Sequence, residues 1–218
     1  MLSEIKYLFL RELQLEWRNK TAFSGLLLYI ASTIFVAYIA LNTNLGDRFW
    51  NALFWIILLF AAVNANAKSF MSEGEGRKLY LYTLANPQAV ILAKICYNAV
   101  LLTVLGILSW GIYSLVMGNP VEDQGQFAIG LVFGCTGLAS TLTLISAIAA
   151  QSGNNPTLMA ILGFPVILPL LLTIVAFSFG ALIGNSWEEN NQYLLALLGL
   201  NGVVIALSYI LFPYLWRD

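Results

Sequence analysis

The densest polar chemistry in this sequence lies at residues 68–94, the one long internal segment that water would solvate well. It places two carboxylates and two cations close together, as Glu73, Glu75, Arg77 and Lys78. Residues 79–84 follow, and they are apolar and aromatic in a stretch that should be wet. Composition leaves two interpretations open: a solvated loop that fixes the topology, or a docking surface for a soluble partner, which the aromatic residues favour.

The residue types needed for common catalytic and metal sites are missing from the sequence. Histidine does not occur, which excludes histidine-based zinc sites, proton relays and triads, and the usual proximal haem ligand. No glycine precedes a lysine, so the phosphate-binding loop G-x-x-x-x-G-K-[ST] is absent. Cys96 and Cys135 lie in apolar runs at a spacing that fits no metal site. We therefore expect a non-catalytic chain that binds neither a metal nor a cofactor directly.

Composition indicates the kind of protein that carries this polar segment. Of 218 residues, 60% are hydrophobic and 10% charged, whereas soluble domains carry about 25% charged residues. Apolar runs fill nearly the whole chain, which predicts a single all-α membrane domain over residues 1–218. A net charge of −1 without a basic patch argues against a nucleic-acid partner. No predicted span has a charge at its middle, which argues against an ion-coupled transporter.

Six apolar runs are long enough to cross a membrane, because about 20 helical residues match a hydrocarbon core of about 30 Å. In the fifth run, Pro165 and Pro169 predict helix kinks. Residues 178–192, which follow it, are expected to form a re-entrant or surface segment. The spans are expected at about 22–41, 50–67, 89–117, 127–150, 157–177 and 193–216.

Small and polar residues inside these runs predict how the helices associate. Gly130, Gly134, Gly137 and Thr141 leave one face of the fourth span nearly free of bulk, which suits close helix packing. Polar side chains within the spans predict interhelical hydrogen bonds in preference to a substrate path. They are Asn64, Asn98, Thr103, Ser109, Thr141, Thr143, Ser146 and Asn201.

Apolar residues recur three or four apart in residues 1–21, which favours an amphipathic helix in the membrane plane over a solvent-exposed leader. All lysines and arginines except Arg48 fall on the side that would hold both termini and residues 68–88. Short loops rich in these residues stay in the cytoplasm. Both termini and the 68–88 loop are therefore expected there. The stripe consists of Leu2, Ile5, Phe9, Leu13 and Trp17.

Three stretches resemble a known family in their order and spacing. They are R-E-L-Q-L-E-W-R-N-K at 11–20, S-F-M-S-E-G-E-G-R-K-L-Y-L-Y-T-L-A-N-P-Q-A-V-I-L-A-K at 69–94, and S-A-I-A-A-Q-S-G-N-N-P-T-L-M-A-I-L-G-F-P-V-I-L-P-L-L-L at 146–172. With six spans and an amphipathic leading helix, the chain resembles the permease subunits of type-two ABC exporters. More narrowly, it resembles the haem exporter B (CcmB) family of cytochrome c maturation, with Pro165 and Pro169 at the matching prolines.

This resemblance implies a homodimeric subunit in the bacterial inner membrane. Its partners would be a separate CcmA-like ATPase that binds ATP, a CcmC-like haem-handling protein and a CcmE-like haem chaperone, so that haem is handled by the complex. The 68–88 loop would be the coupling helix. The resemblance gives the ATPase contact to Glu73, Glu75, Arg77 and Lys78, with Glu12, Glu16, Asn154 and Asn155 as secondary candidates.

Several functions stay open from the sequence. The subunit could export haem, or, because histidine is missing, use ATP hydrolysis to release a haem-loaded chaperone. It could also be an exporter permease for a lipid, drug or polysaccharide, or a membrane scaffold that works without ATP. An intramembrane enzyme is disfavoured, since no span pairs a nucleophile or an acid with a base.

Overall fold

The computed structural model describes residues 1–18, 20–41, 46–71, 86–151 and 156–215. Helices account for nearly all of these residues, and no strand occurs among them, which confirms the predicted all-α class. The described helices are α1 (Leu2–Arg18), α2 (Lys20–Leu41), α3 (Asp47–Met71), α5 (Pro87–Met117), α6 (Gln124–Gln151), α7 (Pro156–Leu182) and α8 (Trp187–Leu215).

Every described helix except α1 is long and apolar enough to cross a membrane, which makes six candidate spans. This number confirms the prediction of a polytopic membrane protein. In the leading helix α1, Leu8 is buried, and Ile5 and Phe9 of the predicted stripe are partly buried. Leu13 of the stripe is exposed, as are Tyr7 and Leu10.

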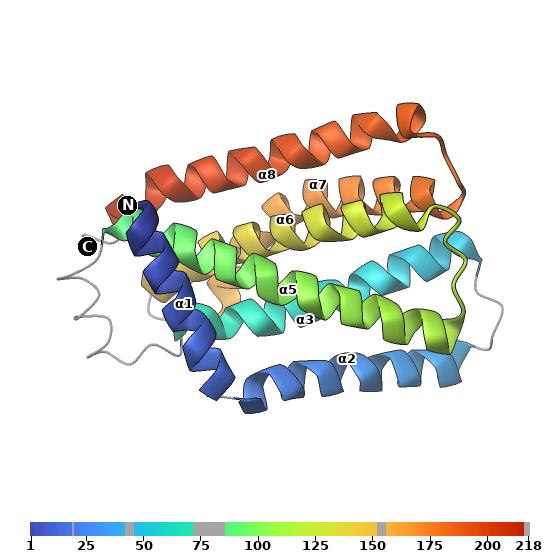
Figure 1. Ribbon diagram of the computed structural model, residues 1–218, viewed down its shortest axis with the longest axis horizontal. Helices are drawn as coiled ribbons and strands as arrows, with labels where there is room; N and C mark the ends of the chain where they lie inside the picture. The colour runs from blue at the N-terminus through green and yellow to red at the C-terminus, as the bar shows by residue number, and fades with distance from the viewer. Residues whose placement is uncertain (19, 42–45, 72–85, 152–155, 216–218) are drawn as a thin grey trace.

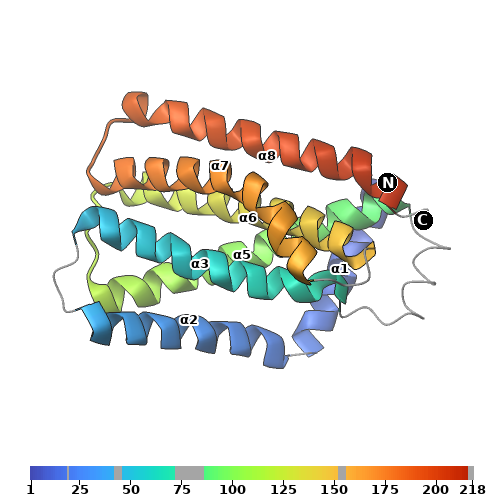
Figure 2. The same ribbon diagram turned by 180° about the vertical axis from the view of Figure 1, so that it is seen from behind.

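The six long helices run side by side, and α1 lies across one end of them at a steep angle (Figure 1). The start of α1 and the end of α8 lie at this same end, which we call the terminal end; the opposite one is the distal end. Seen from the front and from behind, α2 and α8 occupy opposite edges of the bundle (Figures 1 and 2).

Helix α6 is the centre of the bundle and packs against α3, α5, α7 and α8. Its glycines let these neighbours approach closely. A Cβ atom added at Gly130 would lie 2.6 Å from the ring of Phe177, and one added at Gly134 would lie 2.7 Å from the ring of Trp55. One added at Gly137 would lie 2.7 Å from Leu170. The predicted close-packing face is therefore confirmed, and side chains from α3 and α7 fill it.

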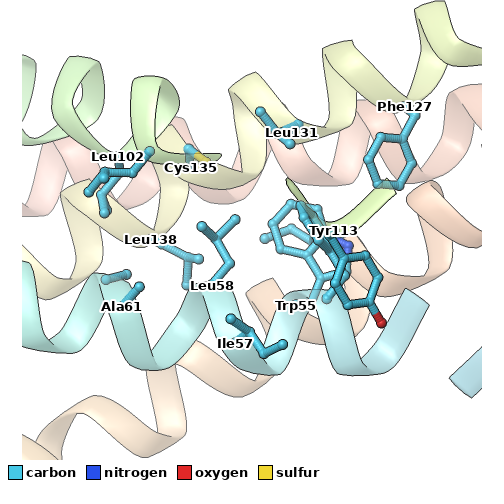
Figure 3. Close-up of a cluster of buried hydrophobic side chains, with 14 of the residues drawn as sticks. Trp55, Ile57, Leu58, Ala61, Leu102, Tyr113, Phe127, Leu131, Cys135 and Leu138 are labelled. Atoms are coloured by element: carbon cyan, nitrogen blue, oxygen red, sulfur yellow. The ribbon is translucent and has the colours of Figure 1, made fainter. Parts of the chain in front are cut away.

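Buried aromatic side chains fill the space between α3, α5 and α6 towards the distal end. Trp50 and Tyr113 have ring centroids 4.7 Å apart, and Phe54 and Phe127 lie 5.6 Å apart. Figure 3 shows Trp55, Tyr113 and Phe127 on one side of this core, with smaller apolar residues continuing it. The Tyr113 hydroxyl donates to the backbone carbonyl of Trp50 at 3.1 Å, so its polar end is satisfied.

A hydrogen-bonded cluster joins α3, α5 and α6 nearer the terminal end. The Asn98 Nδ2 donates to Thr143 Oγ1 at 2.8 Å, and Thr143 Oγ1 lies 3.2 Å from Asn66 Oδ1. Ser146 Oγ also donates to the backbone carbonyl of Asn66, at 3.3 Å. These contacts confirm the predicted interhelical role of Asn98, Thr143 and Ser146, whereas Asn64 is exposed.

A second polar cluster joins α3 to α7 near the distal end. The indole N–H of Trp55 donates to Ser178 Oγ at 2.8 Å, and Ser178 Oγ donates to Asn51 Oδ1 at 2.8 Å. The Asn51 Nδ2 donates to the backbone carbonyl of Val175 at 2.9 Å. The four residues come from α3 and α7, which lie far apart in the sequence. This cluster therefore fixes the position of α7 along the axis of α3.

The interpretation of residues 178–192 as a re-entrant or surface segment is wrong. Helix α7 continues to Leu182, and α8 begins at Trp187. The backbone N–H of Glu122 donates to the Leu182 carbonyl at 3.3 Å and so satisfies the end of the helix. Gly184, at φ 72°, turns the chain back, which a residue without a Cβ does at little cost.

Pro165 and Pro169, the predicted kink sites, both lie inside α7. The helix continues through them, and Figure 2 shows its ribbon changing direction along its length. Each proline removes a backbone donor, which leaves a carbonyl in the preceding turn without its helical partner.

We expect the Gly134→Ala variant to lower the thermal stability of the purified protein. The new methyl group would displace the hydrogen-bonded Trp55 ring, and overpacking of this kind costs about 1–3 kcal/mol. Gly202→Ala on α8 is the matched control, because a Cβ there meets nothing within 4 Å. Thermal unfolding in detergent measures both, and equal melting temperatures would contradict the close packing of α6.

We expect Thr143→Val to destabilise the protein by about 1 kcal/mol, because the isosteric side chain leaves Asn98 Nδ2 and Asn66 Oδ1 without this partner. Thr136→Val, also on α6, is the control. The Thr136 hydroxyl donates within its own helix, to the Val132 carbonyl at 2.8 Å. The same thermal measurement compares them, and a loss for Thr136→Val as large as that for Thr143→Val would argue against the cluster.

Candidate coupling site

Most of the residues predicted to contact an ATPase fall outside the described parts of the chain. Glu16 lies in α1, but its side chain is not among those described. Glu12 is the one predicted contact whose side-chain surroundings can be given. The residues outside the description are Glu73, Glu75, Arg77, Lys78, Asn154 and Asn155.

The helix ends that bracket these segments are described, and they gather at the terminal end. Helix α3 ends at Met71 and α5 begins at Pro87; α6 ends at Gln151 and α7 begins at Pro156. Figure 1 shows these four ends on the same side of the bundle as α1. Both connections that hold predicted contact residues therefore start and finish beside the leading helix.

The start of α5 has a well-defined cap. The Asn86 side chain accepts a hydrogen bond from the backbone N–H of Gln88 at 3.3 Å, and Pro87 occupies the first turn. An asparagine cap satisfies a backbone donor that the helix leaves free, and proline suits a position where no donor is needed. This cap fixes where the chain passes from residues 72–85 into the bundle.

Apolar contacts hold α1 against the start of α5. Leu8 is buried, and Ile5 packs beside it. The cluster joins four helices, because it includes Ala147 of α6 and Phe212 of α8. From α5 it takes Ala89, Val90, Ile91, Ala93 and Ile95.

An ion pair lies next to this apolar contact. Lys94 Nζ of α5 is 3.9 Å from Glu12 Oε1 of α1, and the two side chains are 3% and 18% exposed. Glu12, predicted as a secondary ATPase contact, is thus directed towards the bundle. Sequence reasoning did not find this partnership, although Lys94 lies near the start of the predicted span 89–117 and a charge in an apolar span is expected to have a partner.

The terminal end also holds a groove of about 330 Å³ between the first turn of α5 and the last turns of α8. Its described lining is uncharged and largely aromatic or apolar. It therefore provides no charged group that would select a ligand. The lining residues are Gln88, Tyr209, Ile210, Pro213 and Tyr214.

The described residues offer no metal centre. No group of three or more His, Cys, Asp or Glu among them could hold a metal ion, and Cys96 and Cys135 are free thiols. The described chemical features of this end are therefore a capped helix start, an apolar contact and an ion pair.

Comparison with known proteins agrees with this picture. The family described as CcmB protein matches residues 3–213, nearly the whole chain. No curated protein matches the sequence. The match covers α2, α3, α5, α6 and α7 completely and nearly all of α1 and α8. The chain therefore belongs to the CcmB family, the membrane permease subunits of haem-exporting ABC transporters in c-type cytochrome biogenesis.

Proposed function

We propose that this subunit couples ATP hydrolysis by a separate ATPase to a conformational step in c-type cytochrome biogenesis. The observation that carries the proposal is the family match over residues 3–213 of a chain that lacks a phosphate-binding loop. A permease without its own nucleotide site needs an ATPase partner. The ATPase would bind in the cytoplasm, at the terminal end, where the sequence concentrates its charged internal loop.

The contact to the ATPase would be made by Glu73, Glu75, Arg77 and Lys78. The helices on either side support this proposal, because α3 and the capped start of α5 bring the chain to the terminal end. Because the loop connects α3 to α5, a movement of the loop on ATP hydrolysis would be transmitted to both helices. The ATPase would also lie close to α1, where the exposed Tyr7 and Leu10 offer further apolar surface.

We favour release of a haem-loaded chaperone over a haem cavity inside these helices. The chain has no histidine to ligate haem. Among the described residues, Phe177, Trp55 and Leu170 occupy the glycine face of α6. Haem would then be held by a haem-handling partner, and this subunit would undergo the ATP-driven conformational change. Export of haem through the subunit is the second candidate, which the family supports.

A pair of these subunits would complete the transporter. Helix α2 lies at an edge of the bundle and exposes apolar residues along its length. Lipid covers such faces as readily as a second copy does, so the pairing rests on the family. The exposed large residues of α2 are Leu28, Phe35, Val36, Tyr38 and Ile39.

Reversing the charge of the loop carboxylates tests the coupling. We expect Glu73→Lys and Glu75→Lys to reduce the ATPase turnover of the purified complex by about tenfold, because each replaces a carboxylate of the proposed contact by a cation. Glu188→Lys is the control, since Glu188 is exposed in the first turn of α8 at the distal end. Turnover that is unchanged in all three variants would favour a scaffold that works without ATP.

Single cysteines test the orientation in the inner membrane. In a background lacking Cys96 and Cys135, we expect Glu75→Cys to react with impermeant maleimide only from the cytoplasm. Glu188→Cys should react only from the outside, because six spans place the two ends of the bundle on opposite sides. Labelling of both cysteines from one side would contradict the proposed topology.

A further inference from the structure

We infer that Glu12 and Lys94 are positioning residues that lock α1 to one register on α5, so that the two helices move as one unit. This inference deepens the proposed coupling function and rests on it for its consequence. It assigns Glu12 to an internal contact in place of a contact with the ATPase.

The place of the ion pair in the fold is the first support. Lys94 lies about two turns into α5, and α5 is the helix that follows residues 72–85 directly. A displacement of its first turns would therefore reach Lys94 along a continuous helix. Through Glu12 the same displacement would pass to α1, which crosses the end of the bundle (Figure 1).

Burial is the second support. Lys94 is 3% exposed, and a buried ammonium group is costly unless an opposite charge and hydrogen bonds compensate it. Replacing a buried ion pair by apolar residues often costs no stability, whereas removing one partner does. Such a pair is therefore better explained by the geometry it specifies than by the stability it adds.

The apolar contact beside the pair does not set a register by itself. Hydrophobic contacts are non-directional, and the α5 side of this cluster includes two small residues, Ala89 and Ala93. Leu8 could shift along such a surface by a turn with little loss of buried area. The pair removes this freedom together with Leu8, which lies four residues before Glu12 on α1. A shift by one turn would bring either Leu8 against the buried Lys94 or Glu12 among the apolar residues.

A charge swap tests the lock through α1 itself. In the purified chain in lipid nanodiscs, we expect Glu12→Lys and Lys94→Glu each to speed hydrogen–deuterium exchange of α1 amides by about tenfold. The double variant with both changes should return exchange close to the wild-type rate. Gln14→Lys is the control, because it adds a lysine at an exposed position of the same helix.

An apolar double variant tests whether the ion pair sets the position of α1 or only the stability of the protein. We expect Glu12→Leu combined with Lys94→Met to keep the melting temperature, and yet to lower ATPase turnover in the complex by about tenfold, because α1 has lost its register. A purely structural pair would leave turnover unchanged. Lys6→Met, at an exposed position of α1, is the control.

Two results would overturn the inference: exchange in the charge swap no slower than in the single variants, or wild-type turnover in the apolar double variant. Failure of the proposed function looks different. If the wild-type chain does not affect turnover of any ATPase, the coupling proposal fails, while the exchange experiment on the isolated chain still decides whether the lock exists.

Discussion

The structure depends on the close approach of helices to α6. In a bilayer the lipid tails are as apolar as leucine, so helices associate through packing and hydrogen bonds. Gly130, Gly134 and Gly137 remove the side chains that would hold neighbours away, and bulky residues of α3 and α7 enter the space. Without this face α6 could not contact four other spans, and the remaining contacts would have no common centre.

Hydrogen bonds then set the depth of the helices that packing brings together. One cluster, around Thr143, joins α3, α5 and α6 towards the terminal end, and another, around Ser178, joins α3 to α7 towards the distal end. Between them lies an apolar and aromatic interior. A shift of α3 along its axis would break both clusters at once, which makes α3, α5, α6 and α7 a common body.

The leading helix joins this body at one end only. It packs on α5 near the capped start of that helix, and the Glu12–Lys94 pair lies at this contact. Residues 68–88, the predicted coupling loop, come directly before this part of the chain. In the proposed function, this arrangement places α1 and the start of α5 at the end of the bundle where the ATPase would bind. The distal end closes with a tight turn at Gly184.

Much of this protein follows from local properties of the sequence. Composition and run length determine the six spans, glycine spacing determines the packing face of α6, and the absence of histidine and of a phosphate loop excludes whole classes of site. Only the tertiary structure decided that Asn66 bonds across helices while Asn64 is exposed, that Glu12 meets Lys94, and that α7 passes Ser178 to Leu182. Residues two apart on a helix point in nearly opposite directions, about 200° apart. Which direction is inward depends on neighbours that are distant in sequence.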